Sequence, residues 1–207
     1  MKYYFILLIL FLLGFSSCSE FSNNSSTIFY MQDSLYKVSF DKPIELDTFY
    51  DWKDEDDNAC SDVHKYRFSK KNFPPQKETG FFGTSYADST YRLTFEHVEE
   101  FDCKSNKNNR IFMSPDEYRE ALELKAKSDG KSININYIKE LKINEKIFLL
   151  CAYQIDESYI NKYLTHYLKG ITMIDGNAIR ITADCRTGDC NDFIESMENT
   201  FETIRIE

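Results

Sequence analysis

Residues 171–183 read ITMIDGNAIRITA, two apolar and partly alternating runs on either side of Asp175-Gly176. An Asp-Gly pair between such runs is a strong short-range signal for a β-hairpin, because both residues tolerate the positive φ that a tight hairpin turn requires. The pattern therefore predicts two antiparallel strands joined at Asp175-Gly176. An antiparallel sheet is the expected centre of the fold.

The segment before this hairpin, residues 157–170, fits two structures. Tyrosines at 159, 163 and 167 repeat every four residues, which favours a helix that Asp156 would cap and Gly170 would end. The same segment leads directly into the hairpin, so its second half also fits an extended strand. We expect the first hairpin strand to reach back to about Tyr163, and the helix remains the alternative.

Two further strands are predicted upstream, over residues 63–69 (VHKYRFS) and 91–98 (YRLTFEHV). Both alternate between apolar and polar residues, as half-buried strands do. We expect them to pair antiparallel, in a register that places Arg67 opposite Glu96. Additional strands are expected over residues 28–31, 35–40, 132–137, 146–154 and 203–206.

Helix signals occur at two places. Ser114-Pro115-Asp116-Glu117 forms a capping box with proline at the first helical position, and Asp129-Gly130 marks the end of that helix near Ser128. Apolar residues at helical spacing over 193–201 predict a C-terminal helix, with Asp189 as its expected N-cap.

These elements predict a single α+β domain over residues 28–207, an antiparallel sheet with helices packed against it, including the C-terminal helix. The order of elements resembles that of the PsbP-like α/β/α sandwich. The resemblance rests on element order and carries no functional residues to this chain.

The N-terminal 17 residues have the pattern of an export signal. Lys2 precedes an apolar run from Tyr3 to Phe15, which is shorter than the roughly 20 residues that a membrane-spanning helix needs. Residues 14–18 (GFSSC) resemble the lipobox of bacterial lipoproteins, in a relaxed form like that of Bacteroidota. The resemblance implies that Cys18 is acylated and becomes the new N-terminus. An ordinary signal peptide cut near Ser17, with Cys18 in a disulfide, is the alternative.

If Cys18 carries lipid, residues 18–27 form a polar tether and the chain is held on a membrane of the cell envelope. We expect the outer membrane, and the sequence does not indicate which of its faces. Long acyl chains would make this attachment effectively permanent.

The other five cysteines are expected to be structural, because export leads to an oxidising compartment. Cys185 and Cys190 flank a turn-like tetrapeptide that can bring them within bridging distance. The register proposed for the two upstream strands places Cys60 opposite Cys103, which predicts a second disulfide. Cys151 lies inside an apolar run and is expected to be a buried free thiol.

The chain has a formal net charge of −9, which argues against nucleic acid as a partner and leaves a basic protein open. Acidic residues concentrate over 47–62, where Asp54 and Asp56 are weak candidates for a cation site, but a solvated acidic loop is favoured. His64 and His97 are weak candidates for a surface zinc site. The sequence contains no nucleotide-binding, hydrolase or cofactor motif, so no cofactor is expected.

The sequence therefore predicts a membrane-anchored envelope lipoprotein that acts as a non-enzymatic binding or structural module with a protein partner. One alternative is an immunity or inhibitor protein in which residues 54–57 neutralise a basic toxin. Another is a metal-assisted envelope enzyme that relies on His64, His97 and the acidic loop.

Overall fold

The computed structural model describes residues 24–31, 35–54, 61–70, 90–100, 114–156, 164–186 and 190–207. The strands in this part of the chain are β1 (Asn24–Met31), β2 (Tyr36–Pro43), β3 (Thr48–Asp54), β4 (Ser61–Ser69), β5 (Thr90–Glu100), β6 (Ser132–Ile143), β7 (Lys146–Asp156), β8 (Thr165–Ile174), β9 (Asn177–Arg186) and β10 (Arg205–Ile206). The helices are α2 (Pro115–Ser128) and α3 (Asn191–Thr203).

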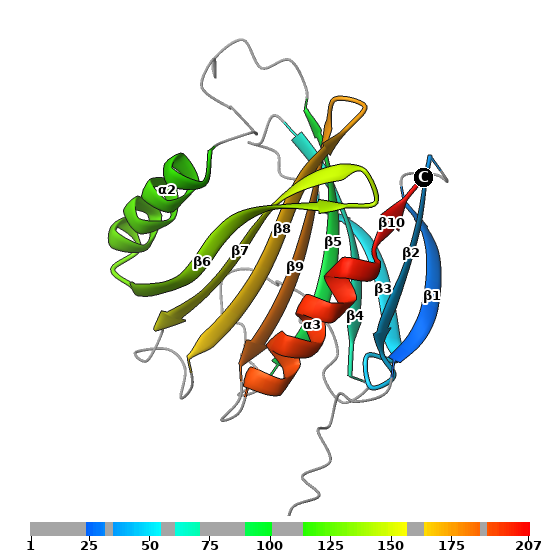
Figure 1. The fold of residues 1–207 in the computed structure, drawn as a ribbon, viewed down its shortest axis with the longest axis horizontal. Helices are drawn as coiled ribbons and strands as arrows, with labels where there is room; N and C mark the ends of the chain where they lie inside the picture. Colours follow the sequence, from blue (N-terminus) through cyan, green and yellow to red (C-terminus); the bar gives the residue numbers. More distant parts are fainter. Residues whose placement is uncertain are drawn as a thin grey trace, which may run out of the picture.

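The strands form two antiparallel sheets (Figure 1). The larger has seven strands in the order β3-β4-β5-β9-β8-β7-β6, and the smaller has the order β1-β2-β10. Helix α3 crosses the larger sheet and contacts β8, β9 and β2, while α2 lies beside the edge strand β6. The predicted fold class, an antiparallel α+β domain with a packed C-terminal helix, is confirmed.

The core lies between α3, the small sheet and one face of the large sheet. Phe193, Met197 and Phe201 follow one another at intervals of four on α3, and none of the three is exposed to solvent. They meet the inward residues of the central strands, among them Leu168 and Ile181, which are also completely buried. This apolar stripe makes the C-terminal helix part of the core.

The predicted hairpin at Asp175-Gly176 is confirmed, with β8 and β9 on its two sides. Asp175 and Gly176 both have positive φ, 51° and 84°. Strand β8 starts at Thr165, so the helix alternative is wrong for residues 165–170, and residues 157–163 lie outside the described part. Gly170 ends no helix. It lies mid-strand, where an added Cβ would stand 2.7 Å from Phe201 Cε1 of α3.

The capping box of α2 is also confirmed. The Glu117 backbone N–H donates to Ser114 Oγ at 3.3 Å, and the Ser114 N–H donates to Glu117 Oε2 at 2.8 Å. The expected N-cap of α3 is wrong. Cys190 occupies that position without a side-chain capping bond, and Asp189 lies outside the described residues.

The predicted pairing of residues 63–69 with 91–98 is correct in direction and wrong in register. Arg67 stands opposite Thr94, and Glu96 stands opposite Lys65. A shift of two residues keeps every side chain on its face, so the alternating pattern could not separate the two registers. Cys60 and Cys103, whose disulfide was predicted from the register with Arg67 opposite Glu96, lie outside the described residues.

Two boundaries differ from the prediction at the N-terminal side. Strand β1 begins at Asn24, with Thr27 opposite Phe40, so residues 24–27 belong to the folded domain rather than to the tether. Residues 48–54 of the expected acidic loop form strand β3 along β4. Tyrosine, phenylalanine and tryptophan inside this stretch favour a strand despite its charge.

Candidate functional site

The two faces of the large sheet have opposite character. On β9, Ile179, Ile181 and Ala183 are completely buried on the α3 side. The residues between them, Arg180 and Thr182, lie on the other side because successive side chains of a strand alternate. We call the side of the large sheet that faces away from α3 the polar face.

The polar face concentrates positive charge. Its two carboxylates on the central strands β4, β5, β8 and β9, among the described side chains, are Glu96 and Asp184. The six basic side chains of the same strands on this face are Lys65, Arg67, Arg92, Lys169, Arg180 and Arg186. A chain whose net charge is negative therefore presents a basic surface at the centre of its sheet.

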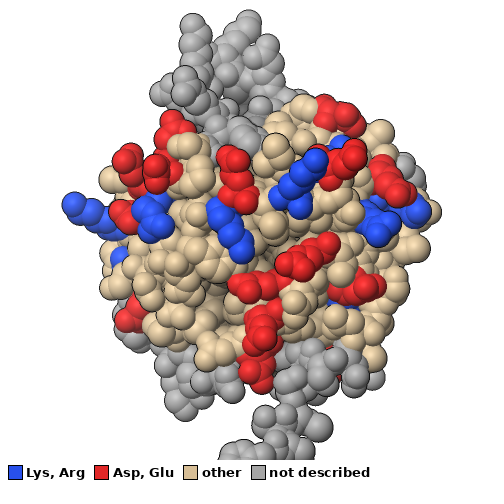
Figure 2. Space-filling view, in the orientation of Figure 1, with Lys and Arg blue, Asp and Glu red and all other residues tan. Residues whose placement is uncertain are grey.

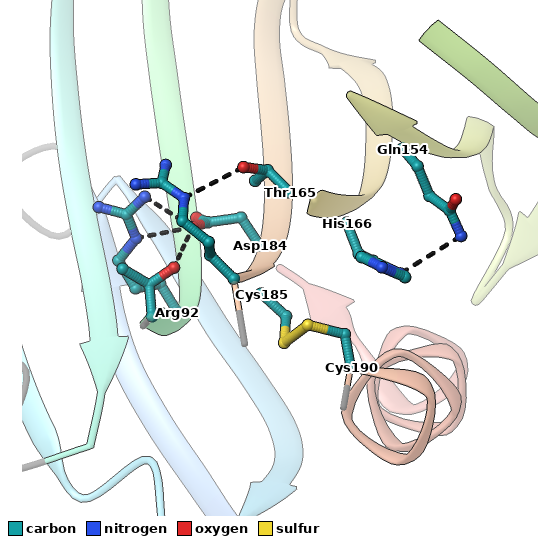
Figure 3. Close-up of a disulfide and its surroundings, with 9 residues drawn as sticks. Arg92, Gln154, Thr165, His166, Asp184, Cys185 and Cys190 are labelled. Carbon is teal, nitrogen blue, oxygen red and sulfur yellow. Dashed lines mark hydrogen bonds and ion pairs between the residues drawn. A yellow bond between two sulfur atoms is a disulfide. The ribbon is translucent and has the colours of Figure 1, made fainter. Parts of the chain in front are cut away.

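Asp184 is the anchor of a buried network at one end of the polar face (Figure 3). Its Oδ2 lies 2.6 Å from Arg92 Nη2 and accepts a hydrogen bond from Arg92 Nε at 2.8 Å. Thr90 Oγ1 also donates to it, at 3.5 Å. The neighbouring Arg186 donates from Nε to Thr165 Oγ1 at 3.1 Å. Bonds of this kind fix the direction of the guanidinium groups.

The second carboxylate, Glu96, pairs with Lys65. Lys65 Nζ lies 3.8 Å from Glu96 Oε1, and each side chain is less than a quarter exposed. Arg67, which the sequence-based register paired with Glu96, instead donates from Nε to Thr94 Oγ1 at 3.1 Å. Each of these two carboxylates of the central strands therefore has a cation directly beside it, Lys65 for Glu96 and Arg92 for Asp184.

Lys169 lies between these two ion pairs. Its Nζ is 5.4 Å from the centroid of the Tyr153 ring and 5.3 Å from that of Tyr167, and the two rings stack at 5.0 Å. Burial lowers the pKa of Lys169; Glu96, Cys151 and Asp184 oppose that shift. Arg180, its diagonal neighbour on β9, adds to the lowering.

Helix α2 borders this region through Tyr118. Burial raises the pKa of Tyr118 to about 12, with a further contribution from Cys151 and an opposing one from Arg180. Burial likewise raises the pKa of Tyr153. Both phenols are therefore neutral hydrogen-bonding groups at neutral pH.

Helix α3, on the opposite side of the large sheet, is acidic. Figure 2 shows acidic side chains gathered over α3. Of the four carboxylates of this helix, Asp192, Glu195 and Glu202 are exposed, and the sequence of the helix contains no basic residue. Glu198, half-buried, accepts a hydrogen bond from the Tyr137 hydroxyl. The basic central strands of the polar face and the acidic helix α3 thus lie on opposite sides of the large sheet.

The predicted Cys185–Cys190 disulfide is confirmed, with the two Cα atoms 5.8 Å apart. Figure 3 shows it on the side of β9 away from Arg92 and Asp184. Cys151 is a free thiol with no exposed surface, and burial raises its pKa to about 12, so it is unreactive at neutral pH. Cys18, Cys60 and Cys103 lie outside the described residues.

The metal-site candidates do not form a surface cluster in the described residues. His64 lies directly opposite His97, but His97 is completely buried and packs 5.7 Å from the Tyr36 ring centroid. Asp54 pairs with Val63 at the end of β3, and Asp56 is not among the described residues. In the described ranges, no group of three or more His, Cys, Asp or Glu side chains is placed to hold a metal ion.

The polar face was not predicted from the sequence. Its signal is present on β9, where Arg180, Thr182, Asp184 and Arg186 alternate with buried residues. The net charge of the chain does not reveal this strip, because it sums the basic residues of the polar face with the acidic residues of α3. The missing information is the strand order, which brings β4 and β5 beside β9 and β8.

Across the described ranges, every helix is too short or too polar to span a bilayer.

No protein-family model matches the chain, and no curated protein matches its sequence. The solved structures that match this chain include the following two. The solution structure of CyanoP, the cyanobacterial PsbP from Synechocystis sp. PCC 6803, has a TM-score of 0.52 and 10% identity, covering 93% of this chain and 99% of that one. PA94, a protein of unknown function from Pseudomonas aeruginosa, has a TM-score of 0.43 and 9% identity, covering 86% of this chain and 94% of that one. The likeness to CyanoP shows that the fold is of the PsbP type.

Proposed function

We propose that this protein is a lipid-anchored protein of the cell envelope, on the outer membrane, and that it acts as a non-enzymatic binding module. Its polar face engages an acidic partner protein. The observation that carries the proposal is the strip of six basic side chains against two carboxylates on a chain of net negative charge. Complementary charge steers association and fixes the orientation of partners.

The lipobox-like residues 14–18 support the anchor. Because β1 begins at Asn24, residues 19–23 alone separate the lipidated Cys18 from the folded domain. A chain of this length spans at most about 20 Å. The domain would be held close to the bilayer, and a partner would be met at the membrane surface.

Replacing Cys18 with alanine is expected to move the protein from the membrane fraction to the soluble fraction, because the acylated side chain is removed. Fractionation of cells followed by immunoblotting measures the distribution. Ser17→Ala is the matched control, since a small residue before the cysteine is retained, and it should stay in the membrane fraction. Unchanged membrane association of the Cys18→Ala protein would refute the anchor.

A second candidate is an immunity or inhibitor protein against a basic toxin. It is favoured by the acidic helix α3 rather than by residues 54–57, of which 55–57 lie outside the described part. The double charge reversal Glu195→Lys/Glu202→Lys would abolish neutralisation of such a toxin and leave binding at the polar face intact. A gene for a secreted toxin beside this one would favour this candidate.

A further inference from the structure

We propose that Lys169 and Arg180 form the point on the polar face where a carboxylate of the partner, an aspartate or glutamate side chain, docks. This inference rests on the proposed function and names the chemical group that the face recognises. Three observations support it. The two cations lie side by side, the neighbouring carboxylates already form ion pairs with other cations, and two tyrosine rings pack against Lys169.

The two cations are diagonal neighbours on adjacent strands. Lys169 of β8 stands opposite Thr182 of β9, and Arg180 stands opposite Ile171. Diagonal neighbours of an antiparallel pair are about 7–8 Å apart at Cα, within reach of long side chains. One carboxylate placed between them could therefore accept bonds from both, a charge-assisted arrangement that is stronger than a neutral hydrogen bond.

Neither cation has a hydrogen bond or an ion pair with a described residue. On the central strands β4, β5, β8 and β9, the described carboxylates of the polar face are Glu96 and Asp184. Glu96 pairs with Lys65 and stands opposite Arg180 in the register, and Asp184 pairs with Arg92. Glu140 lies on the same face at the edge strand β6. Arg180 is exposed and Lys169 is half-buried. With no ion pair to a described residue, both side chains are available to a carboxylate from outside the domain.

Two tyrosine rings support the ammonium group of Lys169. Tyr153, only 2% exposed, and Tyr167 lie beneath the ammonium group. Thr182 and Thr94 face one another on the adjacent strands and flank the site with hydroxyl groups. A cation held on aromatic rings in a poorly solvated position is pre-organised for an anion, which limits the entropy lost on binding.

The test uses the folded protein with a fluorescent hexaglutamate peptide as the probe, monitored by anisotropy at low salt. Lys169→Met and Arg180→Gln should each weaken binding at least tenfold. Arg205→Gln removes the same charge from an exposed position on β10 and is the matched control; it should change binding less than twofold. Hexalysine should not bind to the polar face.

A second measurement separates docking from structural support. Methionine keeps the apolar contact with the tyrosines and removes a desolvated charge, so Lys169→Met should unfold at a urea concentration equal to or above that of the wild type. A lower midpoint would assign Lys169 a structural role and overturn the inference.

The peptide-binding measurement distinguishes failure of the proposed function from failure of the docking point. If the wild type does not bind hexaglutamate, the proposed acidic partner is wrong. If it binds and the Lys169→Met and Arg180→Gln proteins bind equally well, the polar face stands and this docking point is overturned.

Discussion

Replacing Phe201 with alanine is expected to lower the free energy of unfolding by about 3–5 kcal/mol, the range for deleting a buried phenylalanine. Phe201 is completely buried on α3, and its ring fills the space that the absent side chain of Gly170 leaves on β8. The deletion opens a cavity where the C-terminal helix meets the sheet. Urea denaturation followed by circular dichroism measures the change.

Gly170 provides the cross-check on this packing. Gly170→Ala should destabilise by about 1–3 kcal/mol through overpacking, because its Cβ would meet the Phe201 ring. In a protein that already carries Phe201→Ala, the Gly170→Ala change should lower the free energy of unfolding much less, because the truncated side chain at position 201 leaves room for the added Cβ. Leu124→Ala on α2, where Leu124 is 68% exposed, is the control and should stay within about 0.5 kcal/mol. Additive effects of the two core changes would contradict the close contact between α3 and β8.

Replacing Asp184 with alanine is expected to destabilise the protein by about 3 kcal/mol. Asp184 is 5% exposed and holds the Arg92 guanidinium, so the change leaves a mostly buried cation without its carboxylate. Removing one partner of a buried pair costs roughly 3–5 kcal/mol, and the lower end applies because the Arg92 side chain is 24% exposed. Denaturant titration at pH 7 gives the value.

Two further variants test whether the unpaired charge of Arg92 causes this loss of stability. Asp184→Asn retains the shape and part of the hydrogen bonding, so it should lose less stability than Asp184→Ala. The double variant Arg92→Met/Asp184→Leu removes both charges and should recover most of the loss, because an apolar pair of similar volume substitutes well for a buried ion pair. A loss below about 1 kcal/mol in Asp184→Ala would show that the network does not support the sheet.

The fold could be predicted where the signal is local. The capping box at Ser114, the Asp175-Gly176 turn and the apolar stripe of α3 each depend on residues close in sequence, and all three are confirmed. The register of β4 and β5 could not be predicted in the same way. Lys65 and Arg67 are both suitable partners for Glu96 and lie on the same face, so charge and alternation fit either choice equally.

The candidate site depends on non-local pairing. Arg92 and Asp184 are 92 residues apart in sequence, and they meet because β5 pairs with β9. Nothing in the alternation of either strand indicates which strand lies beside it. The sequence also suggested His64 and His97 as candidates for a surface zinc site. In the structure, the His97 ring lies in the core beside Tyr36.

The claim that the polar face is the working surface can be tested directly by photo-crosslinking in cells. Tyr50 of β3 lies opposite Arg67 at the border of the polar face, and Tyr30 of β1 is 55% exposed elsewhere on the domain. A photoreactive phenylalanine at each position replaces one aromatic residue with another, so the two proteins form a matched pair. We expect a covalent adduct of higher mass with the probe at position 50, its loss when Lys169→Met and Arg180→Gln are added, and no adduct at position 30. Equal adducts at both positions, or none at position 50 in protein that is correctly anchored, would contradict the account.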